Sequence, residues 1–145
     1  MSLLLFLYFY GIIRITERGE SMWDCLVVAA GGAIGAVMRY LIGKLPIGSE
    51  SGFPLKTFIV NIAGCFVIGL VAALAAKQLS DNPRAVLFLK VGICGGFTTF
   101  SSFALETGSL MSKGSYLTAA AYVILSVVLG VAAVFTAQFI ADRAF

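Results

Sequence analysis

Four long runs of apolar residues, separated by short polar segments, dominate the sequence. The runs cover about residues 25–43, 57–76, 85–110 and 117–141. The segments between them contain turn-forming residues, in Pro46-Ile-Gly-Ser, Gly52-Phe-Pro, Asp81-Asn-Pro and Lys113-Gly-Ser. A helix that spans the hydrocarbon core of a membrane needs roughly 20 mainly apolar residues. The pattern therefore predicts an all-α membrane protein with four transmembrane helices.

The first 21 residues depart from this pattern. The apolar stretch 3–13 is only about half as long as a span, and the polar segment Arg14-Ile-Thr-Glu-Arg-Gly-Glu follows it. A secretory signal peptide carries positive charge before its apolar stretch, and none precedes this one. We expect residues 1–21 to be a leader that reflects a misassigned start before Met22, or alternatively an interfacial anchor. Residues 22–145 would then form the membrane domain.

Composition agrees with a membrane protein. Hydrophobic residues make up 60% of the chain, charged residues 12%, and the mean hydropathy is +1.01. Soluble domains average about 25% charged residues, and so apolar a small chain cannot hide its surface in a water-soluble core. The chain has no histidine, the usual general base. A soluble enzyme and a disordered chain are excluded, and the scattered net charge of +3 forms no basic patch for nucleic acid.

Basic residues are almost evenly divided between the two ends of the predicted helices. With four spans, both termini and the loop 77–84 share one side. After position 21, that side carries Lys77, Arg84, Lys90 and Arg143, and the other side carries Lys44, Lys56 and Lys113. Membrane proteins orient by the asymmetry of Lys and Arg, so this near balance favours insertion in both orientations. The alternative is a single topology set by the weak bias, or by Arg14 and Arg18.

Small residues recur four apart in three of the predicted spans. The pairs are Gly31 and Gly35, Gly92 and Gly96, and Ser126 and Gly130. Such pairs let helices approach closely in a membrane. They can serve packing within one chain or contact between two chains. Their density, in a four-helix unit that is small for a channel or carrier, favours a compact dimer.

Two polar residues stand out in the first two spans, because polar groups in hydrocarbon are costly. Arg39, near the end of the first span, either snorkels to the interface or places a cation at the mouth of an anion path. Asn61 lies one turn into the second span, on the same helical face as Thr57. Its amide has two N–H donors, so it either binds an anion or makes a hydrogen bond that packs the helices.

The third span carries the strongest signal, the stretch Gly92-Ile-Cys-Gly-Gly-Phe-Thr-Thr-Phe-Ser-Ser-Phe103. Gly95-Gly96 followed by Thr98-Thr99 is a poor helix interior, so we expect the helix to break there, near the middle of the apolar run. Backbone freed at membrane depth persists only inside protein or beside a water-filled path. Transport proteins use such broken helices to hold ions.

Hydroxyls and aromatic rings alternate after the expected break. Ser101 and Ser102 extend a polar track, and Phe100 and Phe103 share a helical face. Rings so placed either contact lipid or the core, or turn their positive edges toward a small anion. Three further residues are candidates for the track, with interfacial solvation or bonds between helices as the alternatives: Glu106, Tyr122 and Ser126.

Together these motifs resemble the Fluc (CrcB-type) fluoride channels. The resemblance rests on the third-span string, on Gly-Gly-x-x-Gly-Ala-x-x-Arg-Tyr at Gly31–Tyr40, and on Thr57-x-x-x-Asn61-x-x-Gly64. It covers all four spans in order, from about Met22 to Phe145, and the third-span motif is the most specific. One departure is Ser102, where the family often has Thr, so a hydroxyl is kept.

The resemblance implies a multi-pass channel of the plasma or inner membrane, not an enzyme, that exports toxic cytoplasmic fluoride by passive electrodiffusion. It implies an antiparallel dual-topology homodimer in the lipid bilayer, with two pores and a central structural sodium ion. By position, the fluoride pathway would comprise Arg39, Asn61, Phe100, Ser101, Ser102, Phe103, Glu106, Tyr122 and Ser126. The sodium ion would be held by the backbone carbonyls of Gly95 and Thr98 from each subunit.

Two other classes compete with this interpretation. A four-span exporter of the small multidrug resistance type needs a membrane-embedded carboxylate in its first span to couple protons to a cationic substrate. The first span here offers Arg39 and only Asp24 at its edge, which disfavours this alternative. A non-transporting assembly subunit would explain the small-residue faces, but not a hydroxyl-rich break beside paired phenylalanines.

Overall fold

Each apolar run forms a long helix in the computed structural model, which describes residues 22–48, 52–77 and 82–144. The helices are α2 (Met22–Lys44), α3 (Leu55–Lys77), a composite third span, and α7 (Tyr116–Ala144). The third span consists of α4 (Pro83–Val86), the π-helix η1 (Leu87–Cys94), α5 (Gly95–Phe97) and α6 (Phe100–Ser112). All four spans are long and apolar enough to cross a membrane, and the described residues contain no strand. The predicted four-span, all-α fold is confirmed, while the predicted leader at 1–21 lies outside the described residues.

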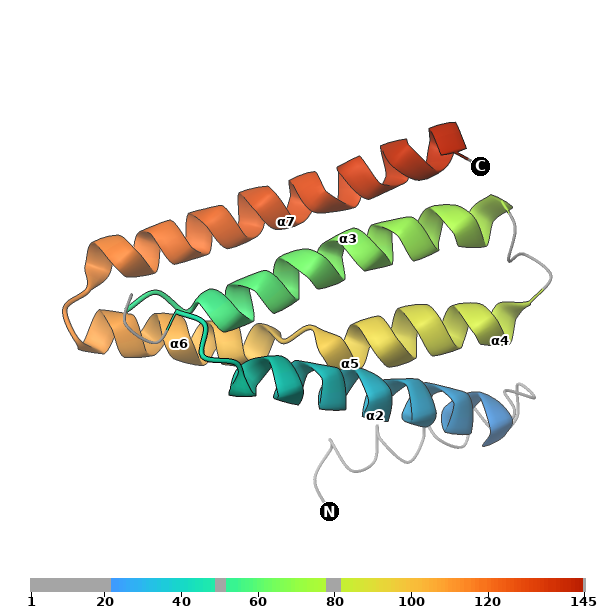
Figure 1. Cartoon of the computed structure of the whole chain (residues 1–145), viewed down its shortest axis with the longest axis horizontal. Helices are drawn as coiled ribbons and strands as arrows, with labels where there is room; N and C mark the ends of the chain where they lie inside the picture. Colours follow the sequence, from blue (N-terminus) through green and yellow to red (C-terminus); the bar gives the residue numbers. More distant parts are fainter. Residues whose placement is uncertain (1–21, 49–51, 78–81, 145) are drawn as a thin grey trace, which may run out of the picture.

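The helices form two parallel pairs (Figure 1). α3 packs mainly against α7, and α2 packs along η1 and α5 of the third span. The start of α2 and the end of α7 lie at one end of the bundle, and the described loop residues 45–48 and 52–54 and the 113–115 turn lie at the other. We call the latter the loop end.

Glycines bring α2 into backbone contact with the third span. A Cβ added to Gly31 would lie 3.0 Å from the Gly92 Cα, and one added to Gly35 would lie 2.7 Å from the Phe97 nitrogen. A Cβ on Gly130 would lie 3.3 Å from a sulfur of α3. The small-residue pairs therefore serve packing within the chain, so they do not by themselves argue for contact between chains.

Charged side chains gather at the two ends, but they are paired at only one of them. At the end that holds Met22, Arg84 Nε lies 2.9 Å from Asp24 Oδ1, and Lys77 Nζ lies 2.9 Å from Asp142 Oδ1. At the loop end, by contrast, the described carboxylates form no ion pair with the basic residues Lys44, Lys56 and Lys113. The loop end is therefore the more positive end of the described chain.

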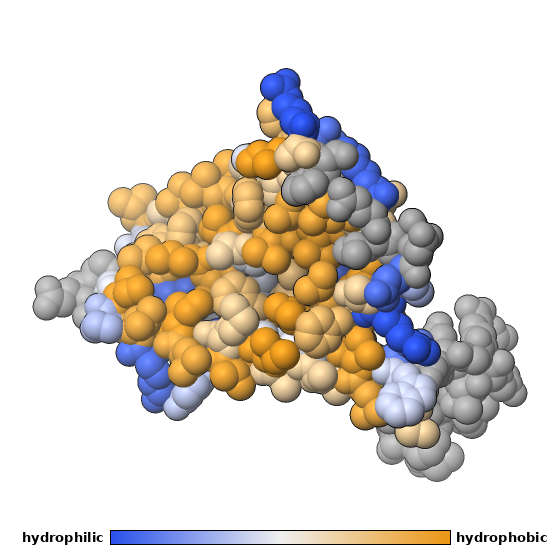
Figure 2. Space-filling view, turned by 45° about the vertical axis from the view of Figure 1, so that its right-hand side comes forward, coloured by the Kyte–Doolittle hydropathy of each residue, from blue (hydrophilic) through white to orange (hydrophobic). Residues whose placement is uncertain are grey.

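Apolar side chains cover most of the outer surface. Figure 2 shows one such face, with hydrophilic residues toward its edges. Leu117 is 85% exposed and Phe100 is 79% exposed, whereas Tyr122 is the largest side chain that is fully buried. In water this surface would be unstable, so it faces lipid or another protein chain.

The break in the third span falls two residues later than its glycines. Gly95 and Gly96 remain helical in α5, while Thr98 (φ −77°, ψ 158°) and Thr99 (φ −149°, ψ 110°) are extended. Gly96 is needed for close packing, since a Cβ there would lie 3.0 Å from the Gly32 Cα. The β-branched threonines favour extended backbone, and Thr99 starts a new helix as the N-cap of α6. A break near mid-span is thus confirmed, with the threonines as its centre.

Candidate functional site

Side chains from two neighbouring helices make hydrogen bonds with the backbone at the break. Thr99 N–H donates to Asn61 Oδ1 (2.8 Å), and Asn61 Nδ2 donates to the Thr99 carbonyl (3.1 Å). From α2, Arg39 Nε donates to the Gly96 carbonyl (3.2 Å). In a continuous helix these backbone groups would bond to residues four positions away. Asn61 therefore replaces the bond that the Thr99 N–H loses at the break, Arg39 replaces the one that the Gly96 carbonyl loses, and Asn61 keeps one N–H for another acceptor.

Three hydroxyls form a chain at the start of α6. Thr99 Oγ1 accepts from Ser102 N–H (3.2 Å), which caps the helix. The Thr99 hydroxyl donates to Ser102 Oγ (3.0 Å) and lies 3.2 Å from Ser101 Oγ. Since a hydroxyl carries one proton, Ser101 is the donor in the last contact. The Ser102 proton then remains for a further acceptor.

Glu106 is held by two hydroxyls, one on each carboxylate oxygen. Thr57 Oγ1 donates to Oε1 (2.7 Å), and the hydroxyl of the buried Tyr122 donates to Oε2 (2.8 Å). While Glu106 is ionised, both protons are committed to it and cannot bind another anion. The three residues form a fixed polar wall that joins α3, α6 and α7.

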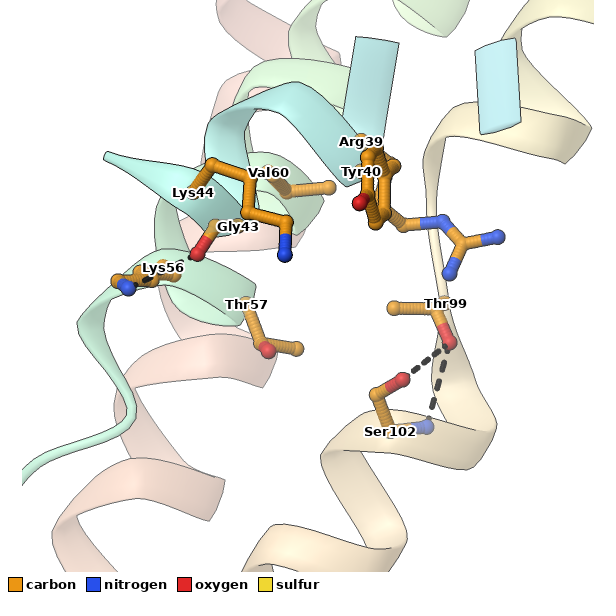
Figure 3. Close-up of a pocket in the computed structure, with 9 residues that line it drawn as sticks. All are labelled: Arg39, Tyr40, Gly43, Lys44, Lys56, Thr57, Val60, Thr99 and Ser102. Carbon is orange, nitrogen blue, oxygen red and sulfur yellow. Dashed lines mark hydrogen bonds between the residues drawn. The ribbon is translucent and has the colours of Figure 1, made fainter. Parts of the chain in front are cut away.

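A cavity of about 380 Å³ leads from the loop end to the break (Figure 3). We call it the loop-end cavity. Lys44 directs its ammonium group toward this space and lies over the Tyr40 ring, 5.0 Å from the centroid. Lys56 points away from the space and donates to the Gly43 carbonyl (2.9 Å). The lining residues are Arg39, Tyr40, Gly43, Lys44, Lys56, Thr57, Val60, Thr99 and Ser102. The cavity is therefore cationic at its outer end and lined by hydroxyls at its inner end.

A second cavity, of about 330 Å³, lies beside the break and is mainly apolar. We call it the break cavity. It is lined by Asn61, Gly64, Cys65, Ile68, Thr98, Thr99, Phe100, Phe103, Ser126 and Val127. Thr99 lines both cavities, so the break lies between them. Within the described part of the chain, the buried Ser126 hydroxyl has no hydrogen-bond partner, which makes it an available polar group beside this cavity.

The two phenylalanines of the third span lie against each other. The ring centroids of Phe100 and Phe103 are 5.6 Å apart with an interplanar angle of 42°, and Phe103 lies 5.0 Å from the Tyr122 ring. Phe100 is largely exposed on the single chain, whereas Phe103 is half-buried. Both rings line the break cavity, and Phe100 also faces whatever covers the chain from outside.

The break leaves carbonyls that a cation could use. Thr99 N–H bonds to Asn61 rather than to the Gly95 carbonyl, and Ser102 N–H bonds to the Thr99 hydroxyl rather than to the Thr98 carbonyl. Gly95 is exposed, with open space around its Cα. Among the described residues, no group of His, Cys, Asp and Glu could hold a metal ion. The carbonyls of Gly95 and Thr98 are thus oxygen atoms without a helical hydrogen bond, which is the type of ligand that hard cations take.

The nine residues predicted for the pathway occupy one region, but in different places. Arg39 and Ser102 line the loop-end cavity, while Asn61, Phe100, Phe103 and Ser126 line the break cavity. Glu106 and Tyr122 meet in the polar wall beside Thr57. Ser101 is exposed and joins the others through Thr99.

Two residues that contact the predicted pathway residues were not themselves predicted to belong to the pathway. Thr57 was noted only for sharing a face with Asn61, and its bond to Glu106 joins helices that are far apart in sequence. Phe53 packs against Tyr122, but its segment was taken only as a turn between spans. The signal available for Phe53 was its spacing from Phe58, which is typical of the apolar pair that brackets a helix start.

Four apolar spans, with a broken third span between a cationic cavity and an aromatic one, define a multi-pass membrane protein with the features of a transport protein. Comparison with known families agrees with this class. The family described as CrcB-like protein, Camphor Resistance (CrcB), matches residues 26–138. The chain belongs to this family.

Curated relatives match over most of the four spans. A protein of Nitrobacter winogradskyi is 50% identical over 110 residues, which cover 74% of this chain and 86% of the relative. One of Agrobacterium fabrum is 45% identical over 79% of this chain and 92% of its own. One of Caulobacter sp. is 45% identical over 86% of this chain and 98% of its own. All three are named fluoride-specific ion channel FluC, a transport rather than an enzymatic activity.

Proposed function

We propose that this protein is a fluoride-selective ion channel that exports toxic cytoplasmic fluoride by passive electrodiffusion. The observation that carries the proposal is the 45–50% identity, over 74–86% of the chain, to proteins named fluoride-specific ion channels. The geometry of the break adds independent support, because it offers hydrogen-bond donors to an anion at the centre of a membrane span.

The proposed path runs from the loop-end cavity past Thr99 to the break cavity. Lys44, beside the first of these cavities, attracts anions at its mouth. Deeper in, fluoride must exchange its tightly held water for fixed donors. The available ones are the Ser102 proton, the second N–H of Asn61 and the Ser126 hydroxyl, together with the positive edges of the two phenylalanine rings. We infer that the path is narrow and that it excludes larger halides by size.

A second, inverted copy of the chain would complete the proposed channel. Backbone exposed at mid-membrane is tolerated only inside protein or beside water, and Gly95 at the break is exposed on the single chain. The exposed ring of Phe100 lies on the same broken span. A two-fold related copy would cover this face with an identical one, giving an antiparallel homodimer with two pores.

In this dimer, the carbonyls of Gly95 and Thr98 from both subunits would surround one point. Carbonyl oxygens attract cations and repel anions, so the fluoride path itself cannot satisfy them. We infer that they bind a structural sodium ion, which supplies positive charge between two anion pores. Asn61 and Arg39 serve this site by holding the break in the shape that frees the two carbonyls.

The first span argues against the multidrug-exporter alternative. Asp24 is the only carboxylate in α2, and it lies at the helix end, where Arg84 Nε donates to it (2.9 Å). A proton-coupling carboxylate would have to lie within the membrane and release its partner during transport.

Reconstitution into liposomes tests the proposed function. We expect vesicles loaded with fluoride to release it through the purified protein when a potassium ionophore balances the charge, as read by a fluoride electrode. Vesicles loaded with chloride should release almost none. Equal rates for the two ions would overturn the selectivity, and the absence of any fluoride release would overturn the function.

A further inference from the structure

A loop residue lies in direct contact with the inner wall of the proposed pathway. We propose that Phe53 is a positioning residue, which holds Tyr122 in place and, through it, both Glu106 and Phe103. The proposal rests on the function proposed above. It assigns to the loop between α2 and α3 a part in the conduction path.

The backbone fixes the position of Phe53 before α3 begins. Gly52, just before Phe53, has a positive φ of 66°, a backbone conformation that glycine adopts without strain. The Phe53 carbonyl accepts from Leu55 N–H (2.7 Å), and Pro54 accepts the first helical bond from Phe58 N–H (3.1 Å). The backbone that carries the Phe53 ring is therefore held by the hydrogen-bonded start of α3.

Phe53 makes edge contacts with two other rings. Its centroid lies 5.5 Å from that of Phe58 and 5.3 Å from that of Tyr122, each with an interplanar angle of 78°. Such edge-to-face pairs are the favoured aromatic geometry. The contact with Phe58 brackets the start of α3, while the contact with Tyr122 reaches a different helix, α7.

A row of rings continues from Phe53 to the break. Tyr122 lies 5.0 Å from Phe103, which lies 5.6 Å from Phe100. Phe53, Phe58 and Phe103 all pack on the small buried cluster that contains Tyr122. The row therefore links a residue just before α3, at the loop end, to the two rings of the proposed pore.

Tyr122 is the member of the row through which Phe53 can act. Its side chain is fully buried and its hydroxyl donates to Glu106 (2.8 Å), while its ring supports Phe103. Loss of the Phe53 edge would leave space on one side of the Tyr122 ring. A rotated Tyr122 would lose its bond to Glu106 and withdraw support from Phe103 together.

A purely local role for Phe53, as the residue that brackets the start of α3, is the competing explanation. Phe58→Leu removes the ring pair with Phe53, keeps an apolar side chain against the buried cluster, and leaves the ring pair between Phe53 and Tyr122. Phe135→Leu, at a ring of α7 that is 66% exposed, controls for the loss of any aromatic ring. The ratio of fluoride flux to chloride flux separates the two roles. A local loss of stability lowers the amount of folded protein and therefore both fluxes, but it leaves their ratio unchanged.

The test is liposome flux for Phe53→Leu, with elution and thermal unfolding as checks on folding. We expect fluoride flux to fall by at least about threefold, as the loss of one edge-to-face pair allows, with a lower fluoride-to-chloride ratio. Phe58→Leu and Phe135→Leu should keep the wild-type ratio. In a Tyr122→Phe background, Phe53→Leu should add less loss than it causes alone, since both changes act on the same bond.

Wild-type flux and a wild-type fluoride-to-chloride ratio in Phe53→Leu would overturn the positioning role. Equal effects of Phe53→Leu and Phe58→Leu on that ratio would also overturn it. So would flux losses that simply add when Phe53→Leu is combined with Tyr122→Phe. If Phe53→Leu does not fold, Phe53→Met carries the same expectations, because it keeps an apolar side chain without a ring. A wild-type protein that releases no fluoride would instead overturn the proposed function.

Discussion

Asn61 and Thr99 exchange two hydrogen bonds across the contact between α3 and the break, one through each side of the amide. The same residue thus satisfies the backbone at the break, keeps one amide N–H that these two bonds do not use, and lines the break cavity. The sequence left packing and anion binding as alternatives for Asn61. The geometry makes the two roles compatible, because they use different atoms.

Asn61→Ala tests this double role. Hydrogen bonds between membrane helices average about 0.6 kcal/mol, so losing both should lower the free energy of unfolding by about 1 kcal/mol. Fluoride flux should fall far more than this stability loss explains. Liposome flux and thermal unfolding measure the two effects, and a variant that only unfolds more easily would leave Asn61 as packing alone.

Phe100→Ile tests the exposed ring at the break cavity. Isoleucine keeps the apolar character and removes the ring edge, so we expect fluoride flux to be nearly abolished. Because the ring is 79% exposed, stability of the single chain should change little. The elution volume in detergent should match that of the wild type. Flux at the wild-type rate would remove this ring from the pathway.

Thr99→Val tests the hydroxyl chain while keeping the branched shape of the side chain. The variant loses the N-cap of α6, which should cost about 1 kcal/mol, and it frees Ser101 and Ser102 to reorient. We expect lower fluoride flux. Thr136→Val is the matched control, since the Thr136 hydroxyl donates only to the carbonyl of Ala132 in its own helix (2.8 Å). The assignment fails if both variants behave alike in flux and unfolding.

Gly35→Ala tests the backbone contact between α2 and the third span. The new Cβ would overlap the Ile93 carbonyl and lie 2.7 Å from the Phe97 nitrogen, and overpacking of this kind typically costs about 1–3 kcal/mol. Gly43→Ala, where no atom lies within 4 Å of the added Cβ, should be neutral or slightly stabilising. Thermal unfolding in detergent compares them, and equal melting temperatures would contradict the close contact.

The fold followed from the sequence because each span is a long apolar run between turn residues. The position of the break was harder to predict, since glycine is a poor helix former by propensity. Gly96 nevertheless stays helical because a side chain there would overlap Gly32. Gly64 in the second-span motif has a similar reason, as its Cβ would collide with the Thr98 side chain. These are tertiary contacts, which no local pattern encodes.

The site was predictable where helical spacing groups its members, as for Phe100 and Phe103 on one face. It was not predictable where bonds cross between helices. The bonds of Glu106 to Thr57 and Tyr122 span 49 and 16 positions, and the π-helix η1 has no counterpart in the sequence signals considered. The contact between Phe53 and Tyr122 joins a residue just before α3 to α7, and it follows a glycine with a positive φ.

The bonds around the break have a mechanical consequence. A continuous third helix would require four hydrogen bonds to break together. They are the bond from Arg39 to Gly96, the two bonds between the Asn61 amide and Thr99, and the bond that caps α6. These restraints come from three different helices, so no single hinge motion relieves them. Straightening of the third span is therefore opposed by both neighbouring helices at once, which makes the kink part of the packing of the folded chain rather than a local property of its own sequence.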